Sequence, residues 1–197
     1  MKSPPFTELE GRFVSQLEKL VADEDRATLA QLRRGLGKPL GFVTERDGWV
    51  LKRTPEISQP EDHRKLAIFA MVASLFALHS KPGGSGSFGE AFRELGLRAP
   101  ASDGSPNPSV EKRFVALLNS NSEELGDRLR HAVSLLRAND IDIAIDWRRL
   151  LHDAQWWDAP RRGVQINWSR DFWGSRRPTD QTTEGELVFE PAEVATA

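Results

Sequence analysis

The sequence contains no cysteine and no hydrophobic run long enough to cross a bilayer. The missing cysteine excludes zinc fingers, iron–sulfur clusters, disulfides and thiol catalysis, and it suits a reducing cytoplasm. The longest apolar stretch, residues 66–78, is shorter than the roughly 20 residues of a membrane helix. The N-terminal stretch MKSPPFTELEGRF lacks the apolar core of a signal peptide. We therefore expect a soluble, cytoplasmic protein without a membrane partner.

Lysine and arginine are absent beyond residue 177, where five acids stand among polar residues without periodicity. Such a segment buries too little apolar surface to fold, so we expect residues 178–197 to be a disordered acidic tail. Because the whole chain carries a formal charge of -2 and this tail carries -5, residues 1–177 carry +3. The part of the chain that folds is therefore mildly basic.

Lysine is also absent from residues 127–177, which contain ten arginines. The planar guanidinium of arginine can bond phosphate or carboxylate through two N–H groups at once. High-GC codon usage produces the same bias, so the excess of arginine does not by itself identify a phosphate-binding surface.

Apolar residues recur at steps of three and four along most of the chain, which is the pattern of amphipathic helices. We expect helices to begin after Thr7 or Ser3, Asp25, Asp62, Ser87, Ser109, Ser122 and Asp146, with Pro160 in the first position of the last helix. Residues 62–79 are apolar on most sides, which predicts a helix at the centre of its bundle. Residues 39–62 are rich in proline and glycine and predict a long loop, with at most a short extended piece at 48–53.

These patterns predict an all-α protein of about eight helices in two small bundles. The first bundle comprises residues 1–98 and the second residues 109–177. A segment rich in Pro, Ser and Gly, residues 98–109, is the expected boundary between them.

Two groups of side chains resemble parts of catalytic or metal sites. The pair His152 and Asp153 occurs in metal-dependent phosphohydrolases, but such a site needs further ligands that the other histidines are not spaced to supply. We interpret the pair as hydrogen-bonded residues on a helix surface. Asp140, Asp142 and Asp146 alternate with isoleucines, which indicates a buried turn instead of a calcium loop. We therefore expect no enzymatic activity, no metal and no cofactor.

The basic residues are the better functional candidates, because binding without base preference requires only several cations along a track of phosphates. Those expected to form such a track are Arg26, Arg33, Arg34, Lys38, Lys112, Arg113, Arg130, Arg137, Arg161, Arg162 and Arg170.

Residues 146–174 contain five of the six tryptophans and five arginines. Trp147, Trp156, Trp168 and Trp173 stand at helical positions beside apolar residues, so we interpret them as core. This rigid base is expected to present Arg161 and Arg162 outward. Arg148 and Arg149 either face phosphate or pair with Asp146, Asp153 and Asp158.

Several stretches resemble the CasB family, the small subunit of the type I-E CRISPR surveillance complex called Cascade. They are DRATLAQLRRGLGKPLG (25–41), FGEAFREL (88–95), the stretch from VEKRF to AQWWD (110–158) and VQINWSRDFWG (164–174). The resemblance covers most of residues 10–174 in the family's order.

The resemblance implies an all-helical subunit that is present in two copies and contacts the backbone and large subunits of Cascade. It further implies that the protein holds guide RNA paired with target DNA and stabilises this R-loop without catalysis. Arg33 and Arg34, Lys112 and Arg113, Arg130, and Arg161 and Arg162 match family positions associated with nucleic-acid contact, whereas the other candidates rest on helix faces alone. The alternatives are a pure protein scaffold or a phosphohydrolase built on His152 and Asp153.

Overall fold

The computed structural model describes residues 5–98, 100–138 and 143–174. Within these ranges the chain forms nine α-helices, one 3₁₀ turn and no strand, so the predicted all-α class is confirmed. In chain order they are α1 (Glu8–Ala22), α2 (Arg26–Arg33), α3 (Thr44–Leu51), η1 (Pro60–Asp62), α4 (His63–Leu78), α5 (Phe88–Leu97), α6 (Pro108–Leu118), α7 (Ser122–Ala138), α8 (Trp147–Gln155) and α9 (Gly163–Trp173). None of these helices is long and apolar enough to cross a bilayer. The predicted acidic tail lies outside the described residues.

Helices α1, α2 and α8 begin where polar side chains cap their first turns, as predicted. The Thr7 hydroxyl accepts from the backbone N–H of Glu10, and the Glu10 carboxylate accepts from that of Thr7, so α1 starts with a capping box. Asp25 and Asp146 cap α2 and α8, each accepting with one carboxylate oxygen from a backbone N–H of the first turn.

The predicted start of α9 at Pro160 is wrong, because this helix begins at Gly163. Pro160 lies in a turn in which the backbone N–H of Arg162 donates to the carbonyl of Ala159. Arg162 itself adopts a left-handed conformation (φ 48°), so a helix cannot continue through it from Pro160.

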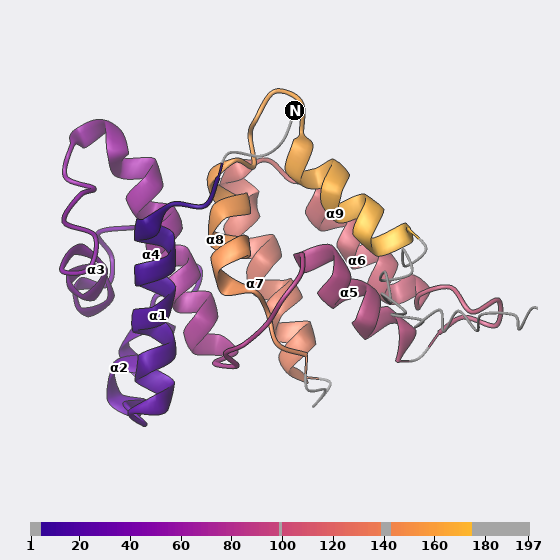
Figure 1. The fold of residues 1–197 in the computed structure, drawn as a ribbon, viewed down its shortest axis with the longest axis horizontal. Helices are drawn as coiled ribbons and strands as arrows, with labels where there is room; N and C mark the ends of the chain where they lie inside the picture. Colours follow the sequence, from indigo (N-terminus) through magenta and orange to yellow (C-terminus); the bar gives the residue numbers. More distant parts are fainter. Residues whose placement is uncertain (1–4, 99, 139–142, 175–197) are drawn as a thin grey trace, which may run out of the picture.

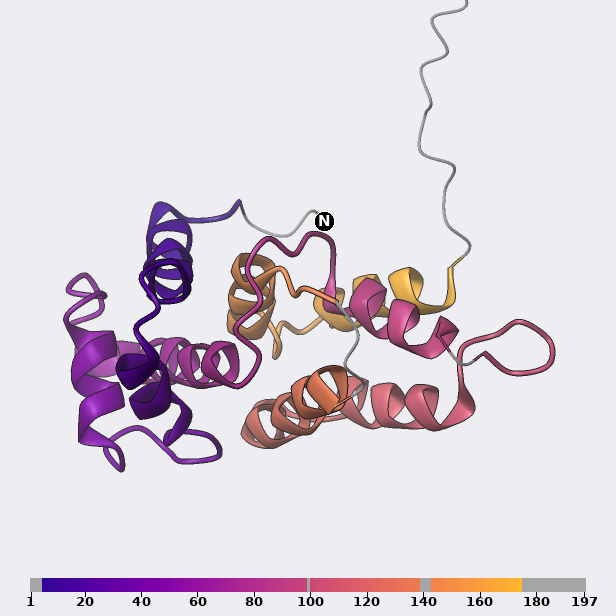
Figure 2. The ribbon, with the colours of Figure 1, turned by 90° about the horizontal axis from the view of Figure 1, so that it is seen from below.

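Helix α4 lies at the centre of the molecule, as its apolar sequence predicts. It contacts α2 and α3 on one side and α7 and α8 on the other. Figure 1 shows α1 to α4 gathered at one end of the molecule, α5, α6 and α9 at the other, and α7 and α8 between them. The same order along the long axis is visible from below in Figure 2.

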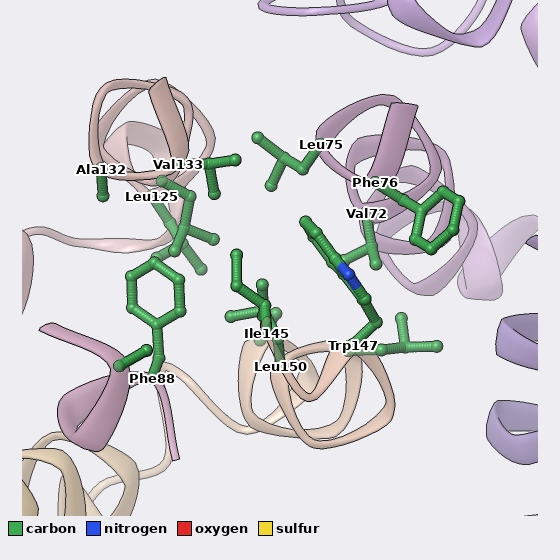
Figure 3. Packing of buried hydrophobic residues seen from close by; sticks show 14 of the residues in the cluster. Val72, Leu75, Phe76, Phe88, Leu125, Ala132, Val133, Ile145, Trp147 and Leu150 are labelled. Atoms are coloured by element: carbon green, nitrogen blue, oxygen red, sulfur yellow. The ribbon is translucent and has the colours of Figure 1, made fainter. Parts of the chain in front are cut away.

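The core is continuous from end to end, and its members come from all nine helices of the described residues. Where α4, α7 and α8 meet, their apolar side chains point towards a common centre (Figure 3). There Trp147 of α8 packs edge-on against Phe76 of α4, with 5.4 Å between ring centroids. Both side chains are almost completely buried, so this contact joins α4 to α8 in the core.

Helix contacts cross the position of the expected domain boundary. Helix α5, which falls in the first predicted bundle, packs on α6 and α9, while α4 packs on α7 and α8. The division into bundles of residues 1–98 and 109–177 stays a prediction, and residues 175–177 lie outside the described ranges.

The prediction of an irregular loop from residue 39 to 62 is wrong for its middle part, which forms α3. Trp49 and Val50 of α3 are buried against the rest of the core. Proline on both sides of this eight-residue helix, and Gly48 within it, hide its short apolar face in the sequence. Tertiary packing, which the local pattern does not report, stabilises it.

Phe76→Ala should lower the free energy of unfolding by about 3–5 kcal/mol, because it empties a fully buried site beside Trp147. The matched control is Phe42→Ala, because Phe42 is 74% exposed. Its effect should stay within about 0.5 kcal/mol. Urea denaturation of both variants measures the difference, and equal losses would contradict the central position assigned to Phe76.

Candidate nucleic-acid interface

The loop between α2 and α3 is held together by a buried arginine, Arg46, whose exposed fraction is 1%. One of its terminal nitrogens donates to the carbonyls of Gly35 (3.1 Å) and Lys38 (2.9 Å), and the other donates to Pro39 (2.8 Å). Its Nε donates to Asp47 at 2.6 Å, and the second oxygen of Asp47 accepts from the backbone N–H of Gly41. A buried charge with this many partners fixes the course of residues 35–41.

At Gly35 this loop lies close against α4 and Arg46. A Cβ atom placed at Gly35 would lie 2.4 Å from Cδ of Arg46 and 2.6 Å from Oγ of Ser74, so no larger residue fits. The loop is therefore packed tightly on its inner side. On its outer side, the side chain of Lys38 is exposed.

A groove of about 460 Å³ separates this loop from α7, with α4 as its floor. Its floor is apolar and includes Ile68, Met71 and Leu75. Charged residues from three elements line it: Lys38 from the loop, Arg64 from α4, and Glu123, Asp127 and Arg130 from α7. Two of the predicted cations, Lys38 and Arg130, thus meet at one groove although they are far apart in the sequence.

Arg130 packs against the backbone of the loop. A Cβ atom at Gly37, whose φ is +66°, would lie 3.6 Å from Nε of Arg130. Arg130 is 3.4 Å from the Asp127 carboxylate, while its buried Nε has no hydrogen-bond partner among the described residues. Its guanidinium therefore lies between the backbone of the loop and the Asp127 carboxylate.

The other predicted cations fall into two groups. Arg33 donates to the carbonyl of Ala77 at 2.8 Å, and Arg162 donates to the carbonyl of Leu118, so part of each guanidinium binds the protein itself. The remaining side chains are exposed: Arg26, Arg34, Lys112, Arg113, Arg137, Arg161 and Arg170. Within the described part of the chain, none of these side chains lines the groove, so a single continuous track stays a prediction.

Arg148 and Arg149 do not form the acid pairs considered from the sequence. Arg149 lies 3.8 Å from the carboxylate of Asp171 on α9. Arg148 donates to the backbone carbonyl of Thr7 at 3.2 Å and stands over the ring of Phe6. Pairing with these acids was one of the two alternatives that the sequence left open. The observed partners are distant in the chain, so no local pattern indicates them.

His152 and Asp153 are buried and turn to different partners, so the expected helix-surface position is wrong. Nδ1 of His152 lies 3.1 Å from the carboxylate of Glu10, and Asp153 accepts from the indole N–H of Trp168 at 2.6 Å. Burial raises the pKa of Asp153, although the Trp168 hydrogen bond opposes this shift. No group of three or more His, Cys, Asp or Glu in the described ranges could hold a metal ion. Asp140 and Asp142 lie outside those ranges.

The tryptophans divide between core and surface. Trp147 and Trp168 are buried, as predicted, and Trp157 is buried as well. The core interpretation is wrong for Trp156 and Trp173, which are 44% and 45% exposed. Trp156 is the C-cap of α8, so its side chain no longer lies on the buried face of that helix. Trp173, in the last turn of α9, donates to Glu111 at the surface.

Sequence reasoning missed Arg46 and Arg64. Three acceptors of Arg46 are backbone carbonyls, which any sequence could supply, so no residue pattern indicates its role. Arg64 reaches the groove from the first turn of α4 and pairs with Asp158 at 2.7 Å, which is 94 residues away in the chain.

Comparison with known proteins gives one consistent family. A family model described as CRISPR-associated protein Cse2 matches residues 28–173. The chain is 32% identical over 166 residues to the CRISPR-associated protein Cse2 of Thermus thermophilus, a match that covers 83% of this chain and 89% of the relative.

Solved structures agree in fold. CasB from Thermus thermophilus superposes with a TM-score of 0.66 at 29% identity, over 84% of this chain and 98% of that one. CasB from M. ruber does so with a TM-score of 0.60 at 34% identity, over 75% and 83% of the two chains. A chain of a CRISPR RNA-guided surveillance complex has the same fold, with a TM-score of 0.60 at 22% identity, over 84% and 91%.

Arg46→Ala should lower the free energy of unfolding by about 3–5 kcal/mol, because it leaves the Asp47 carboxylate without its buried cation. Arg12→Ala is the matched control. Arg12 also pairs with a carboxylate, that of Glu56, but its side chain is 45% exposed, and the expected loss is at most about 1 kcal/mol. Thermal unfolding of both variants, followed by circular dichroism, compares them, and similar losses would refute a fixed loop.

Asp153→Asn should change how stability depends on pH. The pKa of Asp153 is higher in the folded than in the unfolded chain. Its contribution to the free energy of unfolding is therefore fully present at low pH. That contribution is lost as pH rises from the ordinary value of 3.8 through the raised pKa. The free energy of unfolding of the variant, relative to that of the unaltered protein, should therefore increase as pH rises across that interval. Urea titrations at several pH values measure this difference. A difference that does not vary with pH would contradict this assignment.

Proposed function

Because the chain belongs to the CRISPR-associated Cse2 (CasB) family, we propose that it is a non-catalytic small subunit of a type I-E Cascade complex. In this role it binds the phosphate backbone of guide RNA and target DNA without sequence preference and stabilises the R-loop. Its other partners are the backbone and large subunits and a second copy of itself. The related chain from a CRISPR RNA-guided surveillance complex supports membership in such an assembly.

The observation that carries the proposal is the meeting of Lys38 and Arg130 at one groove. These cations come from distant parts of the sequence. The loop that carries Lys38 is held by the buried guanidinium of Arg46. A cation on a fixed loop loses less conformational freedom when it binds phosphate, so the arrangement is preorganised for a charged backbone. Arg34, directly before residues 35–41, is exposed as well.

Backbone contacts of this kind suit an R-loop. Exchange of a DNA duplex for an RNA–DNA hybrid is nearly balanced in free energy, so modest protein contacts to the opened strands shift it. Contacts to phosphate carry no sequence information, and a complex with a changeable guide requires none from this subunit.

One specific observation favours the alternative of a pure protein scaffold. Glu123 and Asp127 line the same groove as the cations, and Arg130 lies 3.4 Å from Asp127. A rim of mixed charge also fits a protein partner with complementary charges. Nucleic-acid binding and assembly must therefore be measured separately.

The double variant Lys38→Gln/Arg130→Gln should bind single- and double-stranded DNA more weakly, by a similar factor for unrelated sequences. The slope of log K against log salt should become shallower by about 0.7–0.9 for each phosphate that the variant no longer neutralises. Arg128→Gln is the matched control, because Arg128 is also an exposed arginine of α7 but lies near Glu124, outside the groove. Fluorescence anisotropy over a range of salt concentrations measures both quantities.

Unchanged affinity and salt slope in the double variant would remove the groove from the proposed interface. If the variant also failed to co-purify with the other Cascade subunits, while the Arg128→Gln protein did so normally, the scaffold alternative would replace the proposal.

A further inference from the structure

Trp156 is an exposed tryptophan with an unused donor. Its side chain is 44% exposed, and its indole N–H has no acceptor among the described residues. Trp173 is equally exposed, but its indole N–H donates to Glu111 at 2.8 Å. Tryptophan combines a large apolar ring with one polar N–H, and for this reason it is enriched where proteins bind other molecules.

The connection that carries Trp156, residues 156–162, is fixed at several points. Trp157 is buried and donates to the carbonyl of Ser120 at 3.0 Å, and Asp158 pairs with Arg64. At the far end Arg162 holds a left-handed conformation and donates to the carbonyl of Leu118. Trp156 is thus an exposed aromatic ring on a rigid support, which lowers the entropy lost on binding.

A second exposed aromatic ring lies on the other side of His152. Phe6 is 49% exposed, and its ring centroid lies 4.9 Å from that of the buried His152, which in turn lies 6.5 Å from that of Trp156. The guanidinium of Arg148 stands 5.1 Å from the centre of the Phe6 ring. Phe6, His152 and Trp156 therefore form an aromatic row beside an exposed cation.

We propose that the exposed rings at the two ends of this row form a stacking site for unpaired bases of a single-stranded nucleic acid, with Trp156 as the main platform and Arg148 and Arg161 as cations for the adjoining phosphates. The site rests on the proposed function, to which it adds recognition of single strands.

Charge favours a nucleic acid over a protein partner at this row. Arg148 and Arg161 are exposed, whereas Asp158 is paired with Arg64 at 2.7 Å. The carboxylate of Glu10 beside His152 is buried and accepts from Gln155 at 2.7 Å. Proteins that bind single strands combine exposed aromatic rings, on which bases stack, with cations that follow the backbone. Because every base has a π face, such stacking distinguishes single strands from duplexes without reading sequence.

The test compares two oligonucleotides with the same backbone, oligodeoxythymidine and an abasic strand of equal length, against the full chain. Trp156→Leu should weaken binding to oligodeoxythymidine about 5- to 150-fold, as the loss of one stacked base predicts. Its binding to the abasic strand and to duplex DNA should equal that of the unaltered protein. The salt slope should also stay unchanged, since every cation is still in place.

Two further variants separate stacking from general damage. Trp173→Leu removes an equally exposed tryptophan outside the row and should leave all affinities unchanged. Trp156→Phe keeps an aromatic face and should recover most of the affinity for oligodeoxythymidine. Thermal unfolding of each variant shows whether it is folded.

Each other outcome has a definite meaning. If Trp156→Leu loses equal affinity for both oligonucleotides, or loses affinity for neither, the stacking site is overturned while the proposed function stands. If binding is unaffected but the variant no longer associates with other Cascade subunits, the row is a protein interface. A wild-type protein that binds neither oligonucleotide nor duplex overturns the proposed function and the stacking site together.

Discussion

Helix α4 imposes the main constraint on this structure, because its apolar side chains face nearly all directions and must be covered on all sides. From Phe69 to Ala77 every residue except Met71 is buried. Helices α2 and α3 cover one side and α7 and α8 the other, so both halves of the chain are packed against a single element. The groove with Lys38 and Arg130 exists because α4 forms its floor and holds its two walls apart.

Polar groups inside the molecule then determine what the surface presents. The guanidinium of Arg46 satisfies three backbone carbonyls and one carboxylate, and this fixes a loop that regular secondary structure does not. Glu10 has a comparable role at α8, where its carboxylate accepts a hydrogen bond from the side chain of Gln155 and lies beside His152. Buried polar groups of this kind must be paired, which confines the chain to one arrangement. Rigid supports for exposed cations and aromatic rings follow from these internal contacts.

The candidate site could be predicted only in part. The helix faces indicated Lys38 and Arg130 as cations available to a partner, and the family resemblance implied nucleic-acid contact for Arg130. The pattern did not indicate that these two share one groove or that Glu123 and Asp127 share it with them. Periodicity assigned Trp156 to the core, yet it stands at the end of α8, where the helical face no longer applies.

The sequence by itself determined the all-α class, most helix starts and the central position of α4, because these depend on local caps and on the spacing of apolar residues. Only the tertiary structure decided the burial of Arg46, the separate partners of His152 and Asp153, and the exposure of Trp156. These features depend on contacts between residues far apart in the chain. Such contacts leave no periodic trace, since a backbone carbonyl or a distant carboxylate accepts a hydrogen bond whatever its local sequence.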